Sequence, residues 1–414
     1  MNRPKDIQGL GARRAALKLL DAVLRRGETL DQAMGAATTG LLTTSDTALA
    51  RAIASEALRW LVDLDAMIDS ATRQRLADDA KARTALRIML VQWLRLDTPP
   101  HAVIATGLPL LAGGPRRLAH GVFSTLVKRA VKLPEAPTLP SAVAARWAAR
   151  APAIAMGLAE PPPLDLTLRD PSATEKWAAM LGGASLASGH VRLERGTAVA
   201  ELPGYAEGAW WVQDIAASLP ARALGVGAGK RALDLCAAPG GKTLQLAAAG
   251  WCVTALDISD RRLDRLRENL ARVRLAADIV VVADALVWEP DRPFDAILLD
   301  APCTATGTAR RHPDVLHRVG HRQIGEMAEW QARLLERAIR WLKSGGTLVY
   351  SVCSLEREEG EKQAPRIDLA PDPIQREGLP EWLTPTPEGW LRTDPGMLAH
   401  RGGMDGFFIA RFRA

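Results

Sequence analysis

The chain changes its hydrophobic periodicity once, near residue 210, and this change limits the folds that it can adopt. Between residues 10 and 132, apolar residues recur at helical spacing, as in Ala15 to Val23 and Ile53 to Leu61. From about residue 210, short apolar runs alternate with amphipathic segments. The sequence therefore predicts a multidomain protein, with an all-α helical bundle followed by an α/β domain built on a doubly wound parallel sheet.

The α/β part can be predicted element by element. The expected strands are 231–235, 252–257, 279–282, 296–300 and 347–351, with a possible last strand at 407–412. The expected helices are 243–249, 261–272 and 327–341. Since parallel strands place their carboxyl ends at one edge of the sheet, a ligand is expected at that edge.

The segment between these two parts is less regular. Thr44 and Ser45 are candidate N-caps in the helical part, and its last helix is predicted at 122–131. A proline-rich stretch at 133–140 has the composition of a linker. A strand at 164–168 follows, and a helix is expected to open after it. We therefore predict three domains, at 1–140, 141–205 and 206–414.

Composition narrows the class of protein. No apolar run reaches the roughly 18 residues of a membrane helix, and no apolar stretch follows the basic N-terminus as in a signal peptide, so an intracellular protein is expected. Residues 1–140 carry 20 lysines and arginines against 13 acids, whereas the remaining residues carry 33 against 34. A basic lobe beside a neutral lobe is typical of polyanion binding, although a solvated helical surface would give the same balance. The four cysteines form no C-x-x-C pair, so no metal site is expected.

The segment 234–243, Asp-Leu-Cys-Ala-Ala-Pro-Gly-Gly-Lys-Thr, joins a predicted strand to a predicted helix. Small residues let a ligand approach the backbone, and the start of a helix offers free N–H groups, so a nucleotide-like cofactor fits here. The segment departs from the phosphate-binding loop G-x-x-x-x-G-K-[ST] at Cys236. Against a phosphate loop, Pro239 removes a backbone donor that such a loop would need.

Two acids at strand ends favour a cofactor with an adenosine. Asp257 lies 17 positions after Gly240, where a carboxylate can accept both hydroxyls of a ribose. Asp284 follows the strand 279–282 and can accept from an adenine amino group. Such a pair suits a cofactor with a cationic sulfonium better than it suits a triphosphate. The alternative for each aspartate is that it caps the element that follows.

Two cysteines follow strand ends that should share one edge of the sheet. Cys303 follows the strand that ends at Asp300, and Cys353 follows the strand 347–351. A thiolate that adds to carbon 6 of a cytosine makes carbon 5 able to attack a methyl group, and a second cysteine can assist release of the enzyme. Lys242 can favour a thiolate nearby, and Asp300 can hydrogen-bond the Watson–Crick edge of an extruded base. Taken singly, either cysteine could instead be a buried apolar residue.

At these residues the chain resembles the ribosomal small-subunit RNA cytosine-5 methyltransferases called RsmB, Sun or Fmu. The resemblance spans nearly the whole chain and is carried by DLCAAPGGKT, DAPCTATG, RRHPD at 310–314 and DGFFIARF at 405–412. It implies a NusB-like RNA-binding domain at 1–140, a connector or small RNA-binding subdomain at 141–205 and a Rossmann-like class I methyltransferase domain at 206–414.

The resemblance also implies roles for single residues. Cys353 matches the family's nucleophile, and Cys303 matches the cysteine that assists release, with Asp300 beside them. The cofactor, S-adenosyl-L-methionine, is expected to be bound by Cys236, Ala237, Ala238, Pro239, Gly240, Gly241, Lys242, Asp257, Asp284 and Asp300.

The partner that the resemblance implies is the 16S ribosomal RNA of the small subunit, in the bacterial cytoplasm, with no membrane and no stable protein partner. Three residues depart from the family pattern: Val352 replaces the usual Thr, Ser124 stands where the helical domain of the family often has Asn, and Asp170 stands where Asn is common. Two other functions stay open from the residues alone, a phosphate-loop NTPase and a non-catalytic RNA-binding factor.

Overall fold

The computed structural model describes residues 8–41, 43–196 and 198–414. The chain divides into two compact units. The first contains the described residues up to Ala159 together with Arg311–Val319, and the second contains Glu160–Arg310 and Gly320–Ala414. The three domains expected at 1–140, 141–205 and 206–414 stay a prediction. Within the described ranges, no helix is both long enough and apolar enough to cross a membrane.

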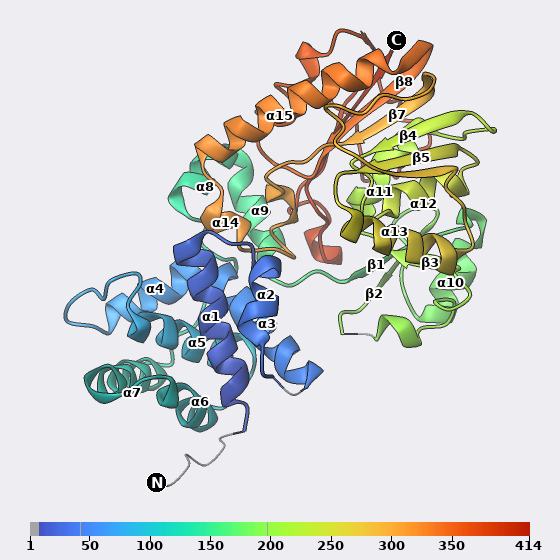
Figure 1. Ribbon diagram of the computed structural model, residues 1–414. Coiled ribbons are helices and arrows are strands. Elements are labelled where there is room, and N and C mark those ends of the chain that lie inside the picture. The colour runs from blue at the N-terminus through green and yellow to red at the C-terminus, as the bar shows by residue number, and fades with distance from the viewer. Residues whose placement is uncertain (1–7, 42, 197) are drawn as a thin grey trace. The chain divides into compact units, whose positions relative to one another are not determined.

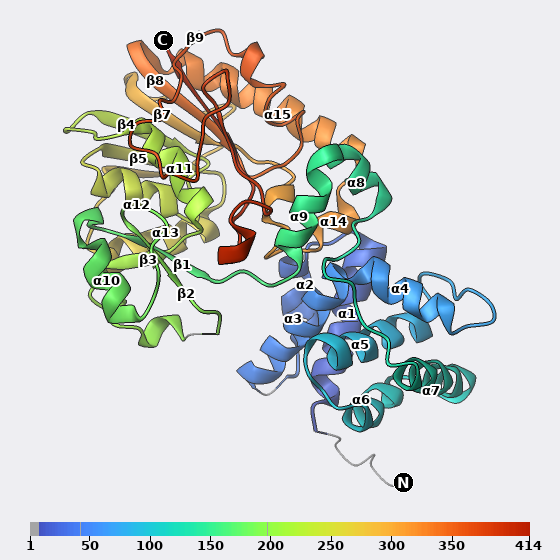
Figure 2. The ribbon, with the colours of Figure 1, turned by 180° about the vertical axis from the view of Figure 1, so that it is seen from behind.

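The first unit is helical. Its core is formed mainly by α1, α3 and α5, which bury Leu19, Ile53 and Leu86 completely, so the predicted helical bundle is confirmed. Its α-helices, seen from two sides in Figures 1 and 2, are α1 (Leu10–Arg26), α2 (Leu30–Thr38), α3 (Thr44–Arg59), α4 (Leu61–Ser70), α5 (Lys81–Arg95), α6 (Pro100–Gly107), α7 (Gly113–Lys128), α8 (Ser141–Trp147), α9 (Ala151–Leu158) and α14 (Val315–Arg318).

Two local predictions for this unit are wrong. The N-cap of α3 is Thr43, whose side chain accepts a hydrogen bond from the backbone N–H of Asp46 at 3.0 Å, and neither Thr44 nor Ser45. The last predicted helix, 122–131, begins nine residues earlier, at Gly113. The residues Gly-Gly-Pro at its start have a turn-like composition, but proline is tolerated in the first turn of a helix.

The short helix α14 belongs to the first unit although it lies far along the chain. Its Val315 and Leu316 are buried, and the His317 Nε2 atom lies 2.6 Å from the backbone carbonyl oxygen of Leu58. Burial lowers the pKa of His317. The chain therefore leaves the second unit after Arg310 and re-enters it at Gly320.

The second unit is built on a large sheet with the strand order β10-β11-β8-β7-β4-β5-β6. Strands β4 to β8 pair in parallel with one another, and β11 runs antiparallel to β8, so the predicted doubly wound α/β fold is confirmed. The strands are β4 (Arg231–Leu235), β5 (Cys252–Asp257), β6 (Ile279–Val282), β7 (Phe294–Asp300), β8 (Leu342–Val352), β9 (Ala370–Pro371), β10 (Leu391–Arg392) and β11 (Phe408–Arg413).

Alternate residues of the strands bury opposite faces of this sheet. On β4, Leu233 and Leu235 pack in one cluster with Leu334 and Ala338 of α15 (His321–Arg340). Ala232, the residue before Leu233, packs in another cluster with helices on the other face. Figure 1 shows α15 across the sheet from those helices, which are α11 (Ile215–Leu224), α12 (Gly241–Ala248) and α13 (Asp260–Val273).

A second, antiparallel sheet precedes the large one, with the strand order β2-β1-β3. Its strands are β1 (Leu164–Leu168), β2 (His190–Leu193) and β3 (Trp210–Val212), and α10 (Thr174–Leu181) packs beside it. The predicted strand 164–168 is confirmed. Asp170 ends the turn after it and accepts from the backbone N–H of Ser172 at 2.9 Å, so this departure from the family pattern serves as a cap.

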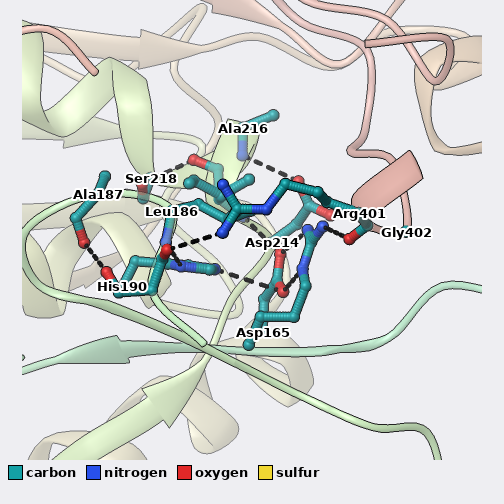
Figure 3. A network of polar contacts seen from close by, with 12 residues as sticks. Asp165, Leu186, Ala187, His190, Asp214, Ala216, Ser218, Arg401 and Gly402 are labelled. Atoms are coloured by element: carbon teal, nitrogen blue, oxygen red, sulfur yellow. Dashed lines mark hydrogen bonds and ion pairs between the residues drawn. The ribbon is translucent and has the colours of Figure 1, made fainter. Parts of the chain in front are cut away.

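A buried carboxylate ties the small sheet to the rest of the second unit (Figure 3). Asp165 of β1 accepts two hydrogen bonds from Arg192 of β2, at 2.7 and 2.8 Å. It also accepts from the backbone N–H of Ile215, at the start of α11, at 3.1 Å. Arg192 continues the network by donating to the backbone oxygen of Arg401 at 2.7 Å. These contacts position α11 beside the candidate site.

Candidate active site

The loop between β4 and α12 has an unusual backbone. Cys236 has a φ of 66°, the Ala238–Pro239 peptide bond is cis, and Gly240, the N-cap of α12, has a φ of 105°. A Cβ atom at Gly240 would lie 2.8 Å from Leu266 of α13. The loop therefore requires glycine at this position for two independent reasons, as the small-residue motif predicts.

The two strand-end acids both accept hydrogen bonds from backbone N–H groups. Asp257 is buried at the end of β5 and accepts from the N–H groups of Ala238, at 3.1 Å, and Ser259, at 2.9 Å. Asp284 follows β6 and accepts from the N–H of Leu286 at 2.9 Å. Both aspartates thus stabilise turns, which is the alternative role that the sequence allowed for each of them. A carboxylate oxygen has two lone pairs, so this role does not use up their capacity to accept from a ligand.

Lys242 and Asp300 form an ion pair at the carboxyl ends of β4 and β7. The Lys242 Nζ atom lies 2.6 Å from one Asp300 oxygen, and Ser351 Oγ donates to the other oxygen at 2.8 Å. Burial opposes the charge on Lys242, but the Asp300 carboxylate outweighs burial and raises the pKa of the Lys242 ammonium. A thiolate at Cys353 would act in the same direction.

The two predicted cysteines meet. Cys303 follows β7 and Cys353 follows β8, and their Sγ atoms lie 3.4 Å apart. The strand register explains this, because Asp300 pairs with Ser351 at the last position of the two strands. The hydrogen bond with Cys353, and then burial, raise the pKa of the Cys303 thiol. Val352, the departure from the family pattern, is buried in the sheet core with Phe408, where a hydroxyl is not needed.

The other two cysteines, Cys236 and Cys252, are unsuited to be nucleophiles. Burial raises the pKa of the Cys236 thiol well above its ordinary range. Cys252 lies at the opposite end of the sheet, at the start of β5, and donates to the backbone oxygen of Gly229 at 3.3 Å. The pair Cys303 and Cys353 therefore differs from the other two cysteines in both place and surroundings.

The structure adds Asp234 to the candidate site. This residue opens the motif 234–243, but the sequence predicts no role for it. It is fully buried on β4, and its Oδ2 atom accepts from Thr243 Oγ1 at 2.5 Å. Its Oδ1 atom has no hydrogen-bond partner among the described residues. Burial raises the pKa of Asp234 to about 7. The feature of the sequence that could have pointed to Asp234 is an acidic residue inside an otherwise apolar strand.

A cavity of about 310 Å³ lies over the loop and the start of α12. It brings together Lys242, Asp300 and Asp234, whereas Asp257, Asp284 and the two cysteines do not line it. Its other walls come from the small sheet, α11 and α13. The lining residues are Val199, Tyr205, Trp211, Val212, Gln213, Ala217, Asp234, Cys236, Ala237, Ala238, Pro239, Gly241, Lys242, Leu244, Asn269, Arg272 and Asp300.

These residues fit a cationic, adenosine-bearing cofactor. Asp257 and Asp300 lie close enough to Asp234 for their negative charges to raise its pKa. A cationic sulfonium and ammonium would relieve that repulsion, and the orphaned Oδ1 atom of Asp234 is a free acceptor for an amino group. The donor set thus agrees with S-adenosylmethionine and disagrees with a triphosphate, which would add negative charge to an acidic site.

Comparison with known proteins gives the family. Residues 221–413 match the model of the family described as 16S rRNA methyltransferase RsmB/F, and residues 10–110 match the NusB family. The ribosomal RNA small subunit methyltransferase B of Pseudomonas putida is 32% identical over 97% of this chain and 98% of its own length.

Solved structures agree in fold. The crystal structure of PH0851 covers the whole chain with a TM-score of 0.71 at 21% identity. The crystal structure of NSun6 from Pyrococcus horikoshii with SFG covers 66% of this chain and 98% of its own, with a TM-score of 0.58 at 20% identity. The enzyme class and the cofactor, S-adenosyl-L-methionine, follow from the family, and the phosphate-loop NTPase and the non-catalytic binding factor are set aside. This chain belongs to the RsmB/F family of 16S rRNA methyltransferases.

Proposed function

We propose that the chain methylates carbon 5 of a specific cytosine in 16S ribosomal RNA, with Cys353 as the nucleophile and Cys303 as the residue that assists release. The observation that carries the proposal is the 3.4 Å separation of the two sulfurs at neighbouring strand ends. One sulfur is needed to activate a cytosine, and a second within reach of the same ring can serve the reverse step.

The roles of the two cysteines follow from their surroundings. Cys303 has a raised thiol pKa, so it keeps its proton and can donate to the Cys353 sulfur. Lys242 supplies a positive charge within range of Cys353. Both features favour Cys353 as the thiolate of the pair.

Lys242 and Asp300 can read the edge of an extruded cytosine. The amino group of cytosine donates, which suits the Asp300 carboxylate, and the adjacent ring nitrogen accepts, which suits the Lys242 ammonium. The two side chains are already 2.6 Å apart, so their orientation is fixed before the base arrives. A uracil would present the opposite pattern of donor and acceptor to this pair.

S-adenosylmethionine supplies the methyl group as an electrophile. The loop Cys236–Lys242, with Asp257 and Asp284, would hold it, and Asp234 is an added acceptor. The Cys353 thiolate adds to carbon 6 of cytosine, and the electron pair of the 5,6 double bond moves to carbon 5, which takes the methyl group. A base then removes the proton from carbon 5, the double bond re-forms, and the carbon–sulfur bond breaks. Cys303 assists this last step.

The basic first unit provides contacts for RNA phosphates. Arg116, Arg117 and Lys128 of α7, and Lys132 after it, are exposed and form no ion pair with any residue that the structure describes. Cations without acidic partners are available to neutralise phosphates, and binding through them falls as salt rises. We include this surface in the proposal as the part that holds ribosomal RNA.

The proposal is tested with 16S RNA transcribed with tritium on carbon 5 of its cytosines. Methylation at carbon 5 releases tritium in step with methyl transfer, whereas methylation of a nitrogen or of a ribose releases none. Cys353→Ala should abolish release, and Cys303→Ala should accumulate a protein–RNA adduct that survives denaturation. Cys252→Ala is the matched control, because this cysteine lies at the far end of the sheet.

The substrate should be offered both as free RNA and as small ribosomal subunits. Methyl transfer without tritium release would overturn the assignment to carbon 5. Normal turnover by Cys353→Ala would overturn the choice of nucleophile.

A further inference from the structure

A buried carboxylate lies behind the two cysteines. Glu359 belongs to the irregular segment that follows β8 and is fully buried. Burial raises its pKa, although hydrogen bonds to the carboxylate oppose that effect. The two cysteines were found by following strands, whereas Glu359 lies outside any strand or helix.

The carboxylate of Glu359 holds the loop of Cys303. It accepts from the backbone N–H of Thr304, the next residue, at 2.8 Å, and from the Thr304 hydroxyl. The same carboxylate holds the loop of Cys353, because it accepts from the hydroxyl of Ser354 at 2.7 Å. One side chain therefore contacts the residue that follows each cysteine.

The bridge is itself anchored to the sheet and to α15. Gln331 of α15 donates to the Glu359 carboxylate at 3.0 Å and to the backbone oxygen of Pro302, just before Cys303, at 2.9 Å. The hydroxyl of Tyr350 donates to the backbone oxygen of Glu359 at 2.6 Å. Each carboxylate oxygen thus accepts two hydrogen bonds, which fills its capacity.

We propose that Glu359 is a positioning residue for the methyl transfer, which fixes the Cys303 and Cys353 loops to each other so that both sulfurs face one base. The expected effect on methyl transfer rests on the proposed function, whereas the contacts of Glu359 with the two loops do not depend on it. A glutamine would replace one carboxylate oxygen by an amide N–H₂, so the Thr304 and Ser354 hydroxyls, which now donate to one oxygen, would have to accept from the amide and turn their protons elsewhere. An aspartate would keep the charge but not the reach to both loops.

The juxtaposition of the thiols can be measured without turnover. A bifunctional thiol reagent such as dibromobimane bridges two sulfurs only when they are close, and mass spectrometry separates bridged from singly alkylated protein. Wild type should form the Cys303–Cys353 bridge readily. Glu359→Gln and Glu359→Asp should be alkylated singly and bridge more slowly, while Glu358→Gln, an exposed neighbour paired with Lys362, should behave as wild type.

The second arm measures turnover. Glu359→Gln should lower kcat by about 10- to 100-fold, the usual cost of a misplaced reacting group, with KM for RNA and affinity for S-adenosylmethionine unchanged. Unchanged cofactor affinity and cooperative unfolding show that the variant is folded. If Glu359→Gln bridges its thiols and turns over like wild type, the inference is overturned.

Cys353→Ala in the same assay separates the two ideas. If it turns over normally, the proposed function fails, and the bridging arm still decides whether Glu359 holds the loops. If Cys353→Ala is inactive and both Glu359 variants are fully active, only the positioning role is wrong.

Discussion

The Lys242 ammonium and the Asp300 carboxylate lie 2.6 Å apart, although 58 residues separate them in the chain. Lys242 lies in the first turn of α12, which follows β4, and Asp300 ends the neighbouring parallel strand β7, and both residues line the same cavity. A cation and an anion fixed at this distance bind a ligand together, and replacing either one removes the partner that holds the other in position.

Substitution of either partner should therefore have the same consequence. We expect Lys242→Met and Asp300→Asn each to lower single-turnover methylation by about 100-fold, and the double variant to lose little more, because groups that act as a unit are not additive. A double-mutant cycle on the single-turnover rate measures this. The exposed ion pair of Lys343 and Asp295 at the far end of the same sheet provides the control cycle. Fully additive losses for Lys242 and Asp300 would show that they act separately.

The carboxyl-end rule for parallel strands predicted the meeting of Cys303 and Cys353, because it depends on strand order and not on side-chain detail. The same reasoning could not find Glu359, since the segment after β8 has no repeating backbone pattern and is shaped by distant hydrogen bonds. Nor could it assign α14 to the first unit, because nothing in its few residues indicates a partner in α3.

Helix starts were the least predictable local feature. The long helix expected at 327–341 begins six residues earlier, at His321, and ends at Arg340. Its first three residues, 321–323, are polar, so the apolar periodicity that signals a helix begins only at Ile324, after the helix has started. The strand at 407–412 was predicted to within a residue, because its apolar run is buried on both faces between β8 and β10.

Mild oxidation should join the two site cysteines. Their sulfurs are 3.4 Å apart, and a disulfide requires about 2 Å, so a small shift of the loops suffices. Treatment with hydrogen peroxide should oxidise one thiol to a sulfenic acid, which the second thiol then attacks with loss of water. Peptide mass spectrometry should find the Cys303–Cys353 linkage, and thiol reductants should restore activity. Irreversible sulfinic acid at Cys353, without a linkage, would show that the sulfurs do not meet in solution.

Gly240→Ala should weaken cofactor binding more than it weakens the fold. The new Cβ atom would lie 2.8 Å from Leu266 and the residue would have to keep a φ of 105°, so the cofactor loop must shift. Gly250→Ala is the matched control, because Gly250 also has a positive φ but its Cβ atom would meet nothing closer than 3.8 Å. Each variant should lose about 1 kcal/mol of stability from the backbone conformation.

Calorimetric titration with S-adenosylmethionine distinguishes the two variants. Only Gly240→Ala should bind the cofactor more weakly, by about tenfold or more, if a shifted loop costs upward of 1.4 kcal/mol of binding free energy. Equal affinities for the two variants would mean that the loop does not contact the cofactor.

Asp234 should make the second unit less stable as the pH rises toward neutrality. Its pKa is about 7 in the folded protein, against about 4 for an aspartate in an unfolded chain. Between these values the folded protein keeps a proton that the unfolded chain has released, so the free energy of unfolding falls as pH rises. The loss approaches a total on the order of 4 kcal/mol near pH 7 and is absent below about pH 4.

Asp234→Asn removes this titration while keeping an acceptor for the Thr243 hydroxyl. Denaturant unfolding should be measured from about pH 5 to about pH 8. The free energy of unfolding of the variant should rise relative to that of wild type as pH rises, and the difference should become constant above the folded pKa of Asp234. Asp264→Asn, on the exposed side of α13, controls for the general loss of an acidic group. A gap between Asp234→Asn and wild type that does not change with pH would mean that Asp234 is already ionised in the folded protein, and that a hidden cation or water satisfies its second oxygen.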